Sequence, residues 1–500
     1  MADAMPATPE LRHSAQAAVR DDSDVFDVLI IGAGLSGIGA AVHLTKESPQ
    51  KSYAILEGRD AIGGTWDLFR YPGIRSDSDM FTLGYNFKPW TDRKAIADGP
   101  AILAYVNETA DEYGVRDHIR FGHKMVRADW SSADKMWTVT VATAGGERQL
   151  RCNFLFMCSG YYSYNEGLEA EFAGREDFAG TIIHPQFWPD NFDYTGKKVV
   201  VIGSGATAVT VVPEMAKSAG HVTMLQRSPT YMVSRPSEDG MAISLRKWLP
   251  AQTAYNLTRW KNVLMGMTFF RLARRYPEGM KKRFIGMVEK ELPGHDLSHF
   301  TPSYNPWDQR VCAVPDSDMF AAIRDGKVDI VTDHIERFDA SGIQLKSGKH
   351  IDADVIVTAT GLKLEVAGGA AIYTDGERVD FAHRYNYKGV MFSGVPNFAI
   401  TFGYTNASWT LKADLTSEYI CRVLNAMDAK GVKSATPTIK AGEDIGEEPM
   451  LDFSSGYVTK ALAYLPKQGA KKPWKLNQNY IKDRYILRHQ PVDDGVMVFS

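Results

Sequence analysis

The segment Val25-Phe-Asp-Val-Leu-Ile-Ile31-Gly32-Ala-Gly34-Leu-Ser-Gly37 decides the fold of this chain. Its first seven residues are mostly apolar and β-branched, which is typical of a buried parallel strand. A GxGxxG turn follows at once, and a helical pattern follows the turn. Gly32 permits the tight turn, Gly34 lets a pyrophosphate approach the backbone, and Gly37 lets the helix pack on the strand. The segment therefore predicts a Rossmann-like dinucleotide site, with the phosphates at the helix N-terminus.

The next predicted strand, residues 52–57, ends in an acid, Glu57, about twenty residues past the last glycine of the turn. A carboxylate at this position accepts hydrogen bonds from a ribose diol and repels a 2′-phosphate. The first site therefore suits FAD or NAD and not NADP. The alternative interpretation is a structural glycine turn followed by a solvated acid.

A second strand–turn–helix pattern begins at Lys197-Lys-Val-Val-Val-Ile202 and continues through Gly203-Ser-Gly205-Ala-Thr-Ala208. The strand after it ends in Gln226-Arg227-Ser228 instead of an acid. Arginine makes charge-assisted, paired hydrogen bonds to phosphate, so this end suits the 2′-phosphate of NADP. A solvated cation at a strand end is the alternative. Two different dinucleotide sites predict an enzyme that passes electrons from one cofactor to the other.

The chain has 500 residues, which is too long for one ordinary core. We predict an α/β fold of two Rossmann-like dinucleotide-binding domains, for FAD and NADP, with a helical insertion. The expected parts are a disordered tail at 1–24, the FAD-binding domain at 25–160 and 363–500, an interdomain linker at 161–190, the NADP-binding domain at 191–241 and 303–362, and the helical insertion at 242–302.

Composition limits the class of protein. The apolar content of 44% and charged content of 23% are typical of a globular protein, and a net charge of -3 gives no bulk attraction to nucleic acid. The four cysteines are too scattered for a disulfide framework, and no zinc-ligand spacing is found. No stretch reaches the roughly 18 apolar residues of a membrane span. We expect a cytoplasmic protein with no nucleic-acid partner and no metal site.

Residues 242–292 differ from the rest of the chain, because they hold eleven Lys and Arg against three Glu together with several aromatic residues. One interpretation is a basic amphipathic surface that associates weakly with a membrane or covers a substrate entrance. The other is an ordinary helical insertion with a solvated cationic face. The sequence leaves both open.

Two longer motifs indicate the chemistry. Gly63-Gly64-Thr-Trp66-Asp67-Leu-Phe-Arg70-Tyr71-Pro72-Gly73-Ile-Arg75-Ser-Asp77 matches the pattern GGxWxxxxYPGxxxD. Phe178-Ala-Gly180-Thr-Ile-Ile-His184-Pro-Gln-Phe-Trp188-Pro189 matches FxGxxxHxxxWP. In these motifs the chain resembles the type I Baeyer–Villiger monooxygenases, which are class B flavoprotein monooxygenases. Within that family it most resembles the bacterial ethionamide-activating type.

This resemblance implies a reaction. NADPH reduces FAD, the reduced flavin binds O2 as a C4a-peroxide, and one oxygen atom is inserted next to a ketone carbonyl to give an ester or lactone. It also implies oxidation of thioethers or thioamides at sulfur. The reacting groups carry negative charge, so a fixed cation in a dry site stabilises them. The family places an arginine there, which matches Arg310, and Asp77 matches the carboxylate that orients it.

The resemblance also implies which residues bind the cofactors. For FAD they are Gly32, Gly34, Gly37, Glu57, Gly64, Thr65, Trp66, Asp67, Tyr71, Asp77 and Met125. For NADP they are Arg75, Ser76, Gly203, Ser204, Gly205, Ala206, Thr207, Ala208, Arg227 and Ser228. The motif between the two sites contributes Phe178, Gly180, His184 and Trp188. His184 is either a general acid or base or a hinge residue, and its place between the domains favours the hinge.

Two other functions stay open. A flavin-containing monooxygenase that oxidises nitrogen or sulfur without Baeyer–Villiger activity shares both dinucleotide sites, but its linker motif usually ends in Tyr or Phe where Trp188 stands. A non-catalytic FAD/NADP redox sensor that docks on membranes through residues 242–292 is the second alternative. The physiological substrate and the oligomeric state are not predictable from the sequence.

Overall fold

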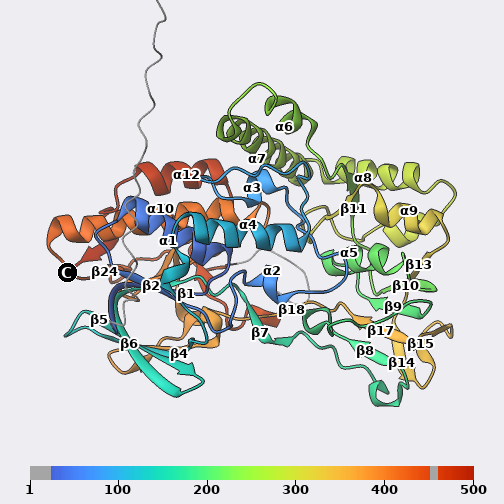
Figure 1. The fold of residues 1–500 in the computed structure, drawn as a ribbon, viewed down its shortest axis with the longest axis horizontal. Helices are drawn as coiled ribbons and strands as arrows, with labels where there is room; N and C mark the ends of the chain where they lie inside the picture. The colour runs from blue at the N-terminus through green and yellow to red at the C-terminus, as the bar shows by residue number, and fades with distance from the viewer. Residues whose placement is uncertain (1–23, 451–459) are drawn as a thin grey trace, which may run out of the picture.

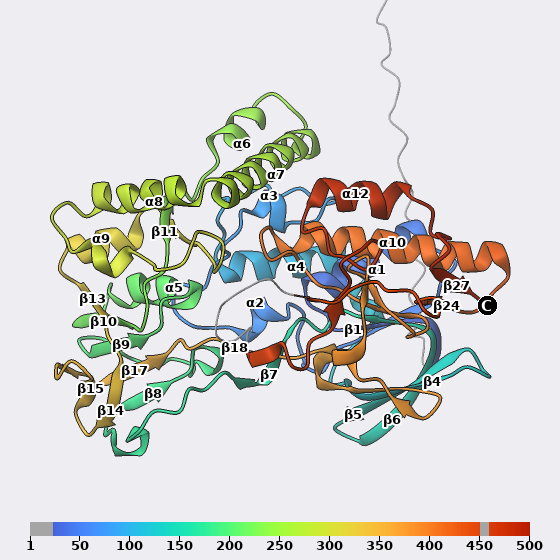
Figure 2. The same ribbon diagram turned by 180° about the vertical axis from the view of Figure 1, so that it is seen from behind.

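Residues 24–450 and 460–500 are described by the computed structural model of the protein (Figures 1 and 2). They form one sheet of eleven strands and one of five, with smaller sheets beside them. The two large sheets lie at opposite ends of the long axis, and the helical insertion lies along one edge (Figure 1). The predicted tail lies outside the described residues except for Asp24.

The first sheet is built around β1 (Val25–Ile31). Residues 28–30 of this strand are fully buried, and burying an aliphatic side chain of this size contributes roughly 1.5–3 kcal/mol. β1 pairs in parallel with β2 (Tyr53–Leu56) on one side and β6 (Gly146–Met157) on the other. The remaining strands of this sheet are β3 (Ile119–Arg120), β4 (Lys124–Ser131), β5 (Met136–Thr143), β19 (Ala371–Thr374), β20 (Glu377–Arg378), β21 (Asn386–Tyr387), β22 (Met391–Phe392) and β23 (Phe398–Ile400).

The C-terminal part of the chain completes this first half. β23 pairs in parallel with β6, and α10 (Trp409–Lys430) packs along α1 (Leu35–Glu47). Both helices are almost entirely buried over most of their length. The other elements here are α2 (Thr65–Leu68), α3 (Met80–Leu83), α4 (Gly99–Glu112), η1 (Arg116–His118), η5 (Ala367–Gly369), η6 (Phe381–His383), β24 (Ala435–Pro437), β25 (Glu448–Pro449), β26 (Lys467–Gln468), α12 (Tyr480–His489) and β27 (Met497–Phe499).

The second sheet is parallel throughout and has the order β13-β10-β9-β17-β8. Its edge strand, β8, lies within the segment predicted as linker. The elements of this half are β8 (Thr181–Ile183), β9 (Lys198–Ile202), α5 (Ala206–Met215), β10 (His221–Gln226), β11 (Met232–Arg235), β12 (Cys312–Pro315), α9 (Asp318–Arg324), β13 (Val328–Thr332), β14 (Ile335–Asp339), β15 (Gly342–Leu345), β16 (His350–Asp352) and β17 (Val355–Thr358), with η2 (Arg175–Asp177) and η3 (Pro185–Phe187) before β9.

The chain crosses between the two halves along β7 (Tyr162–Gly167) and β18 (Leu362–Leu364), which pair with each other in antiparallel orientation. The second half is thus inserted between two parts of the first. This arrangement confirms the predicted fold class of two Rossmann-like units with a helical insertion.

Three helices follow β11 and form the insertion: α6 (Gly240–Leu245), α7 (Ala251–Arg275) and α8 (Pro277–Glu291), with η4 (Leu297–Phe300) after them. α7 packs on α3 and α8, so the insertion joins both halves. Figures 1 and 2 show α6, α7 and α12 along the same edge of the molecule. Among the described residues, none of the helices is both long enough and apolar enough to cross a membrane.

Candidate active site

The first glycine turn has the geometry that the motif requires. Gly32 has φ +105°, and a Cβ there would lie 2.7 Å from the carbonyl oxygen of Cys158. A Cβ on Gly37 would lie 1.8 Å from the carbonyl oxygen of Gly32. No side chain caps the N-terminus of α1 at Gly34, so its backbone N–H groups can bind an anion. The turn therefore fits the pyrophosphate of FAD.

Glu57 is buried at the end of β2 and binds the turn directly. Its two carboxylate oxygens accept hydrogen bonds from the backbone N–H groups of Ala33 (2.7 Å) and Arg59 (2.9 Å). Burial raises the pKa of Glu57, and these two hydrogen bonds oppose the rise.

Arg59 provides a test of whether the site fits a flavin nucleotide. Its Nη2 donates to Asp67 at 2.5 Å, whereas its Nη1 is buried without a hydrogen-bond partner among the described residues. A buried cationic donor of this kind needs an acceptor, and a nucleotide oxygen supplies one. We did not predict Arg59 from the sequence; its signal is a basic residue just after the acid that ends the strand.

The motif that begins at Gly63 packs against this turn. The Gly63 N–H donates to the carbonyl oxygen of Ala33 at 3.1 Å, and a Cβ on Gly64 would lie 3.0 Å from the Cα of Gly34. Thr65 hydrogen-bonds to the Tyr162 hydroxyl at 2.7 Å. Of the other predicted FAD contacts, Asp67 pairs with Arg59, Trp66 packs against the main core, and Met125 is buried in β4, next to the strand end that carries Glu57.

The second glycine turn repeats these features. Gly203 has φ +134°, and a Cβ there would lie 2.4 Å from the carbonyl oxygen of Ala359. A Cβ on Gly205 would meet no atom within 4 Å, so the turn has room for a phosphate, and no side chain caps α5 at this end. Residues 206–208 form the first turn of α5.

Arg227 and Ser228 are exposed at the end of β10, next to this turn. The Ser204 hydroxyl donates to the carbonyl oxygen of Ser228 at 3.1 Å, and the Arg227 guanidinium has no acidic partner within the part of the chain that the structure describes. An unpaired arginine at this position fits the 2′-phosphate of NADP.

Two predicted NADP contacts have partners within the protein. Arg75 forms an ion pair with Asp318 of α9, on the side of the second sheet. Ser76 is buried, and its hydroxyl accepts a hydrogen bond from the backbone N–H of Ser78 at 3.0 Å. Their roles in binding NADP stay predictions.

Asp77 and Arg310 are brought together by the fold although 232 residues separate them in the chain. Arg310 Nη1 lies 3.6 Å from Asp77 Oδ2, and the two side chains are 52% and 38% exposed. Burial raises the pKa of Asp77 although water still reaches the side chain, while Arg310 and Arg75 lower it. The Cys312 thiol, two residues after Arg310, donates to the carbonyl oxygen of Ser204 at 3.9 Å. The pair therefore lies beside the second glycine turn.

Tyr71, a predicted FAD contact, packs against the core of the second half. Burial and the charge of Asp77 raise the pKa of its hydroxyl, and a hydrogen bond with Thr207 opposes this rise. Two residues later, a Cβ on Gly73 would lie 2.9 Å from the Cβ of Glu214 in α5. Residues 63–77 therefore form a strap that begins at the first turn and ends against the second.

A row of aromatic rings follows this strap. Phe69 contacts both Tyr71 and Tyr162, with ring centroids 5.8 Å apart in each case. Tyr161 stacks on Trp409 at 5.1 Å, and the Trp409 indole donates to the Ser36 hydroxyl in α1 at 2.7 Å. The row joins the two glycine turns. Trp409 is the first residue of α10, so the C-terminal part of the chain contributes to this row.

His184 lies where the chain crosses between the halves. Its Nδ1 accepts a hydrogen bond from the backbone N–H of Gln186 at 3.2 Å, and a Cβ on Gly167 of β7 would lie 2.3 Å from its ring. Burial lowers the pKa of His184, and the backbone of Gly361 opposes this. A neutral, enclosed ring at the crossing is compatible with the predicted hinge.

Three further residues of the FxGxxxHxxxWP motif pack on the second half. Phe178 contacts Phe338, Trp188 packs against the second core, and a Cβ on Gly180 would lie 2.4 Å from the carbonyl oxygen of Asp354.

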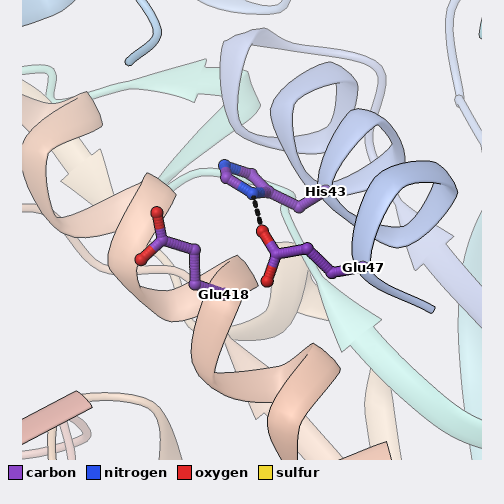
Figure 3. Close-up of side chains that lie close together, drawn as sticks. All are labelled: His43, Glu47 and Glu418. Carbon is purple, nitrogen blue, oxygen red and sulfur yellow. Dashed lines mark hydrogen bonds and ion pairs between the residues drawn. The ribbon is translucent and has the colours of Figure 1, made fainter. Parts of the chain in front are cut away.

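His43, Glu47 and Glu418 come close enough together to resemble a metal site (Figure 3). His43 Nδ1 lies 2.7 Å from Glu47. Burial lowers the pKa of His43, but hydrogen bonds with Asp414 and Glu47 outweigh it and raise the pKa to about 9. His43 is paired with Glu47, and Arg488 binds both oxygens of Glu418, so each of the three side chains already has a partner within the protein. We therefore interpret the cluster as ion pairs that join α1, α10 and α12.

The two dinucleotide turns, with a cation–carboxylate pair beside the second, define a two-nucleotide flavoprotein oxidoreductase. Residues 89–367 match the family described as flavin-binding monooxygenase-like, and residues 30–91 match an NAD(P)-binding Rossmann-like domain. The chain is 56% identical over 478 residues to the FAD-containing monooxygenase EthA of Mycobacterium tuberculosis, which covers 95% of this chain and 98% of the relative. It is 49% identical over 476 residues to the probable FAD-binding monooxygenase AlmA of an Acinetobacter species, covering 95% and 96%. The chain belongs to the flavin-binding monooxygenase-like family.

Solved structures show the same fold. An oxidised steroid monooxygenase bound to NADP aligns with a TM-score of 0.77 at 22% identity, covering 95% of this chain and 99% of that one. An open structure of cyclohexanone monooxygenase aligns with a TM-score of 0.75 at 21% identity, with the same coverage. The predictions of a monooxygenase and of FAD and NADP as its cofactors are confirmed, so the non-catalytic redox sensor is excluded.

Proposed function

We propose that this enzyme is a Baeyer–Villiger monooxygenase that uses NADPH and O2 to convert ketones into esters or lactones, and that it also oxidises sulfur in thioethers or thioamides. The observation that carries the proposal is the Arg310–Asp77 pair, 3.6 Å apart beside the second glycine turn. A monooxygenase that attacks only nitrogen or sulfur has no need of a cation at this place, because those reactions put no negative charge on the substrate.

The cofactors are held by the two turns. The first turn, Glu57 and Arg59 would bind FAD, and the second turn with Arg227 would bind NADPH. When bound, the flavin reduced by NADPH supplies the activated oxygen. The steps below are those of the protein's own side chains.

Arg310 provides the positive charge. When an oxygen nucleophile attacks a ketone, negative charge develops on the carbonyl oxygen, and a fixed cation stabilises it. Guanidinium keeps its proton at any pH at which the protein is folded, because its pKa exceeds about 12. It also presents several N–H donors in one plane, so it can bind a carboxylate on one side and a reacting oxygen on another.

Asp77 positions Arg310. Its carboxylate lies at the end of the strap, where Gly73 fixes the backbone against α5. Burial raises the pKa of Asp77, whereas Arg310 and Arg75 oppose this rise because they favour the charged form, which accepts hydrogen bonds from a guanidinium.

Arg310 is 52% exposed, so bound cofactors and substrate would have to exclude water from it. The aromatic row from Tyr71 to Trp409 would add apolar surface to that enclosure, and a lower local dielectric constant would strengthen the effect of Arg310 on a developing charge. The row also offers an apolar surface to the substrate, in keeping with a ketone or thioether that lacks charge.

The test compares three variants on a panel of linear ketones, cyclic ketones and thioethers, with products identified by mass spectrometry. Arg310→Ala is expected to lower kcat for ester formation by about 100- to 1000-fold, the range seen when one stabilising donor is removed from a site of developing charge. Flavin reduction by NADPH, followed by absorbance, is expected to fall less than about tenfold. Asp77→Asn is expected to fall between wild type and Arg310→Ala.

The matched control is Arg378→Ala, which removes an exposed arginine from β20 at the far edge of the first sheet. Its ketone oxidation should equal that of the wild type. The proposal is wrong if the wild type forms sulfoxides but no ester from any ketone, or if Arg310→Ala forms esters at the wild-type rate.

A further inference from the structure

Exposed apolar side chains gather on one edge of the molecule. Of the fifteen large hydrophobic residues that are exposed in the described part of the chain, ten lie on the stretch from Met241 to Tyr276 or on α12. Trp248 is 86% exposed and Met265 is 56% exposed. Figures 1 and 2 place α6, α7 and α12 together along this edge. We call the surface formed by these three helices and the turn at Trp248 the insertion face.

α7 has one packed side and one apolar side that no described residue covers. Leu257, Leu264 and Leu272 are all exposed and recur at intervals of seven and eight residues, which places them on one stripe of the helix. The opposite stripe, including Arg259 and Val263, is buried. A contiguous exposed apolar surface of this kind marks an interaction site.

The stretch of chain that supplies α6 and α7 to the insertion face differs in charge from the rest. Residues 242–292, which also include the neighbouring α8, hold eleven basic and three acidic residues, whereas the whole chain holds 57 and 60, which leaves 46 basic against 57 acidic elsewhere. Lys247 and Arg271 on the insertion face, and Lys282 on α8, are exposed and have no acidic partner among the described residues. Arg275 lies over the ring of Tyr276 at 5.7 Å. Apolar and cationic side chains therefore alternate on the same surface.

A recess between α7 and α12 continues this pattern. It has a volume of about 300 Å³ and is lined by residues that include Tyr480 and Arg488. Arg484 and Trp260 also line this recess. The Arg484 guanidinium lies 5.4 Å from the centre of the Trp260 ring and forms no ion pair within the described ranges. A cation beside an indole ring is a suitable contact for a phosphate headgroup, because the ring borders the apolar layer and the guanidinium binds phosphate.

The inner side of α7 contacts both segments that carry the proposed catalytic pair. The Asn262 amide donates to Asp79 at 2.8 Å, two residues after Asp77. Phe270 stacks on Trp307 at 6.1 Å, three residues before Arg310. One helix thus has the insertion face on its outer side and the neighbours of the site on its inner side.

We propose that the insertion face docks peripherally on a bilayer that contains anionic phospholipid. The exposed Trp, Leu and Met side chains would enter the boundary between headgroups and acyl chains, and the lysines and arginines would lie at the phosphates. A second copy of the chain fits this face less well, because a two-fold interface sets identical patches against each other and would bring the cations together. If the proposed function holds, an apolar ketone dissolved in the bilayer would reach the site past α7.

The experiment uses the full chain loaded with FAD and sedimentation with large vesicles. One vesicle type is phosphatidylcholine alone, and the other has three parts in ten of phosphatidylglycerol. At about 0.15 M salt the wild type is expected to sediment with the anionic vesicles and to remain in solution with the neutral ones. Raising the salt to about 0.5 M should release much of it, because exposed charges are screened.

Two sets of variants locate the contact. Trp248→Ser/Leu264→Ser/Met265→Ser removes apolar side chains, and Lys247→Glu/Arg271→Glu/Arg275→Glu reverses charges. Each set is expected to lower the partition coefficient at least about tenfold, since both burial and charge contribute to binding at a membrane surface. The matched controls, Leu462→Ser/Val498→Ser and Lys346→Glu/Lys349→Glu, change exposed residues elsewhere and should bind as the wild type does.

The proposal is wrong if the wild type stays in solution with anionic vesicles, or if the control variants lose as much binding as the insertion-face variants. It is also wrong if the wild type is an oligomer that does not bind vesicles and that the insertion-face variants convert to a monomer. The last result would mean that a second copy covers the face. The thermal midpoint and the NADPH oxidation rate without vesicles check that each variant is folded. Vesicle binding is measured without turnover, so its absence would leave the proposed reaction standing. Equally, a failure of the proposed reaction would leave vesicle binding standing.

Discussion

We expect Arg227 to be the residue through which the enzyme distinguishes NADPH from NADH. It is exposed at the end of β10, beside the turn that Gly203 and Gly205 form, and it has no acidic partner in the described part of the chain. The acid at the matching place in the first half, Glu57, is instead buried and bound to the backbone. The two sites thus differ at the position that we expect to meet the ribose of each cofactor.

Arg227→Ala is expected to raise the Michaelis constant for NADPH by about 10- to 100-fold, because a hydrogen bond to a charged group contributes roughly 1.5–3 kcal/mol. The constant for NADH should change less than about threefold, since NADH lacks the 2′-phosphate. Steady-state NADPH and NADH oxidation, measured on the same preparation, gives both values. Equal effects on the two nucleotides would show that Arg227 does not bind the 2′-phosphate.

Sequence reasoning reached most residues of the site but not their neighbours. The glycines and Glu57 could be predicted because strand, turn and helix are adjacent in the chain. Arg310 and Asp77, far apart in sequence, could be paired only through the family resemblance. Arg59 was missed because a lone arginine after a strand is common. Tyr71 packs against the core of the second half, beside α5, which the local motif did not indicate, and its contact with FAD stays a prediction.

At the scale of elements, α1, α10 and α12 are joined by buried charges. His43 of α1 binds Glu47 and lies 3.5 Å from Asp414 of α10, while Arg488 of α12 binds Glu418. The pKa of His43 is raised from 6.5 to about 9 in the folded protein. The protonated form is therefore favoured by folding, and the helices are held partly by this proton.

The stability that His43 contributes should be present in full below about pH 6.5 and disappear as the pH rises through about 9, because the folded pKa lies above the unfolded one. The maximum effect is on the order of 3 kcal/mol. Urea unfolding of the FAD-loaded protein from pH 6 to pH 10 measures it. His43→Gln should flatten this dependence, whereas His383→Gln, at an exposed histidine, should leave it unchanged. A wild type whose midpoint is constant over this range would contradict the assignment.

Elements with a long pattern were predicted more accurately than short ones. β1, β9 and β10 are buried apolar runs that follow the expected period. β8 has three residues and lies inside the segment predicted as linker. The Gly and Pro residues on either side of it favour the prediction of a loop and not of a strand. It forms because Ile182 and Ile183 pair with β17 at the edge of an existing sheet. The stabilisation of this strand comes from tertiary contact, so the local sequence does not indicate it.

For the whole molecule, we expect the crossing formed by β7 and β18 to be the place where the two halves move relative to each other. His184 fills it, with Gly167 against its ring. We expect this contact to couple NADPH binding to catalysis without transferring a proton. Burial lowers the pKa of His184, so the ring is neutral at pH 7 whether it acts as a hinge residue or as an acid or base.

His184→Gln is therefore expected to lower kcat by about tenfold and to leave the shape of the pH profile of kcat unchanged. The reason is that the variant disturbs the geometry of the crossing and removes no general acid or base. Gly167→Ala should have a similar effect, because the added methyl group would collide with the His184 ring. Gly286→Ala, at an open position in α8, is the control. Product formation and hydrogen peroxide release should be measured between pH 5.5 and pH 9. A limb of the wild-type profile that vanishes in His184→Gln would instead show that His184 transfers a proton.

The way α10 and β23 complete the first half has a consequence for synthesis on the ribosome. β6 and α1 emerge early, but their partners β23 and α10 follow only after the whole second half has been made. A chain that ends before about residue 430 would leave the apolar side of α1 uncovered, and one that ends before β23 would also leave the C-terminal part of β6 without this partner strand. The second half, continuous in sequence, can fold while the first half waits. We therefore expect the nascent first half to expose apolar surface until α10 has been made, and to depend on a chaperone during that time.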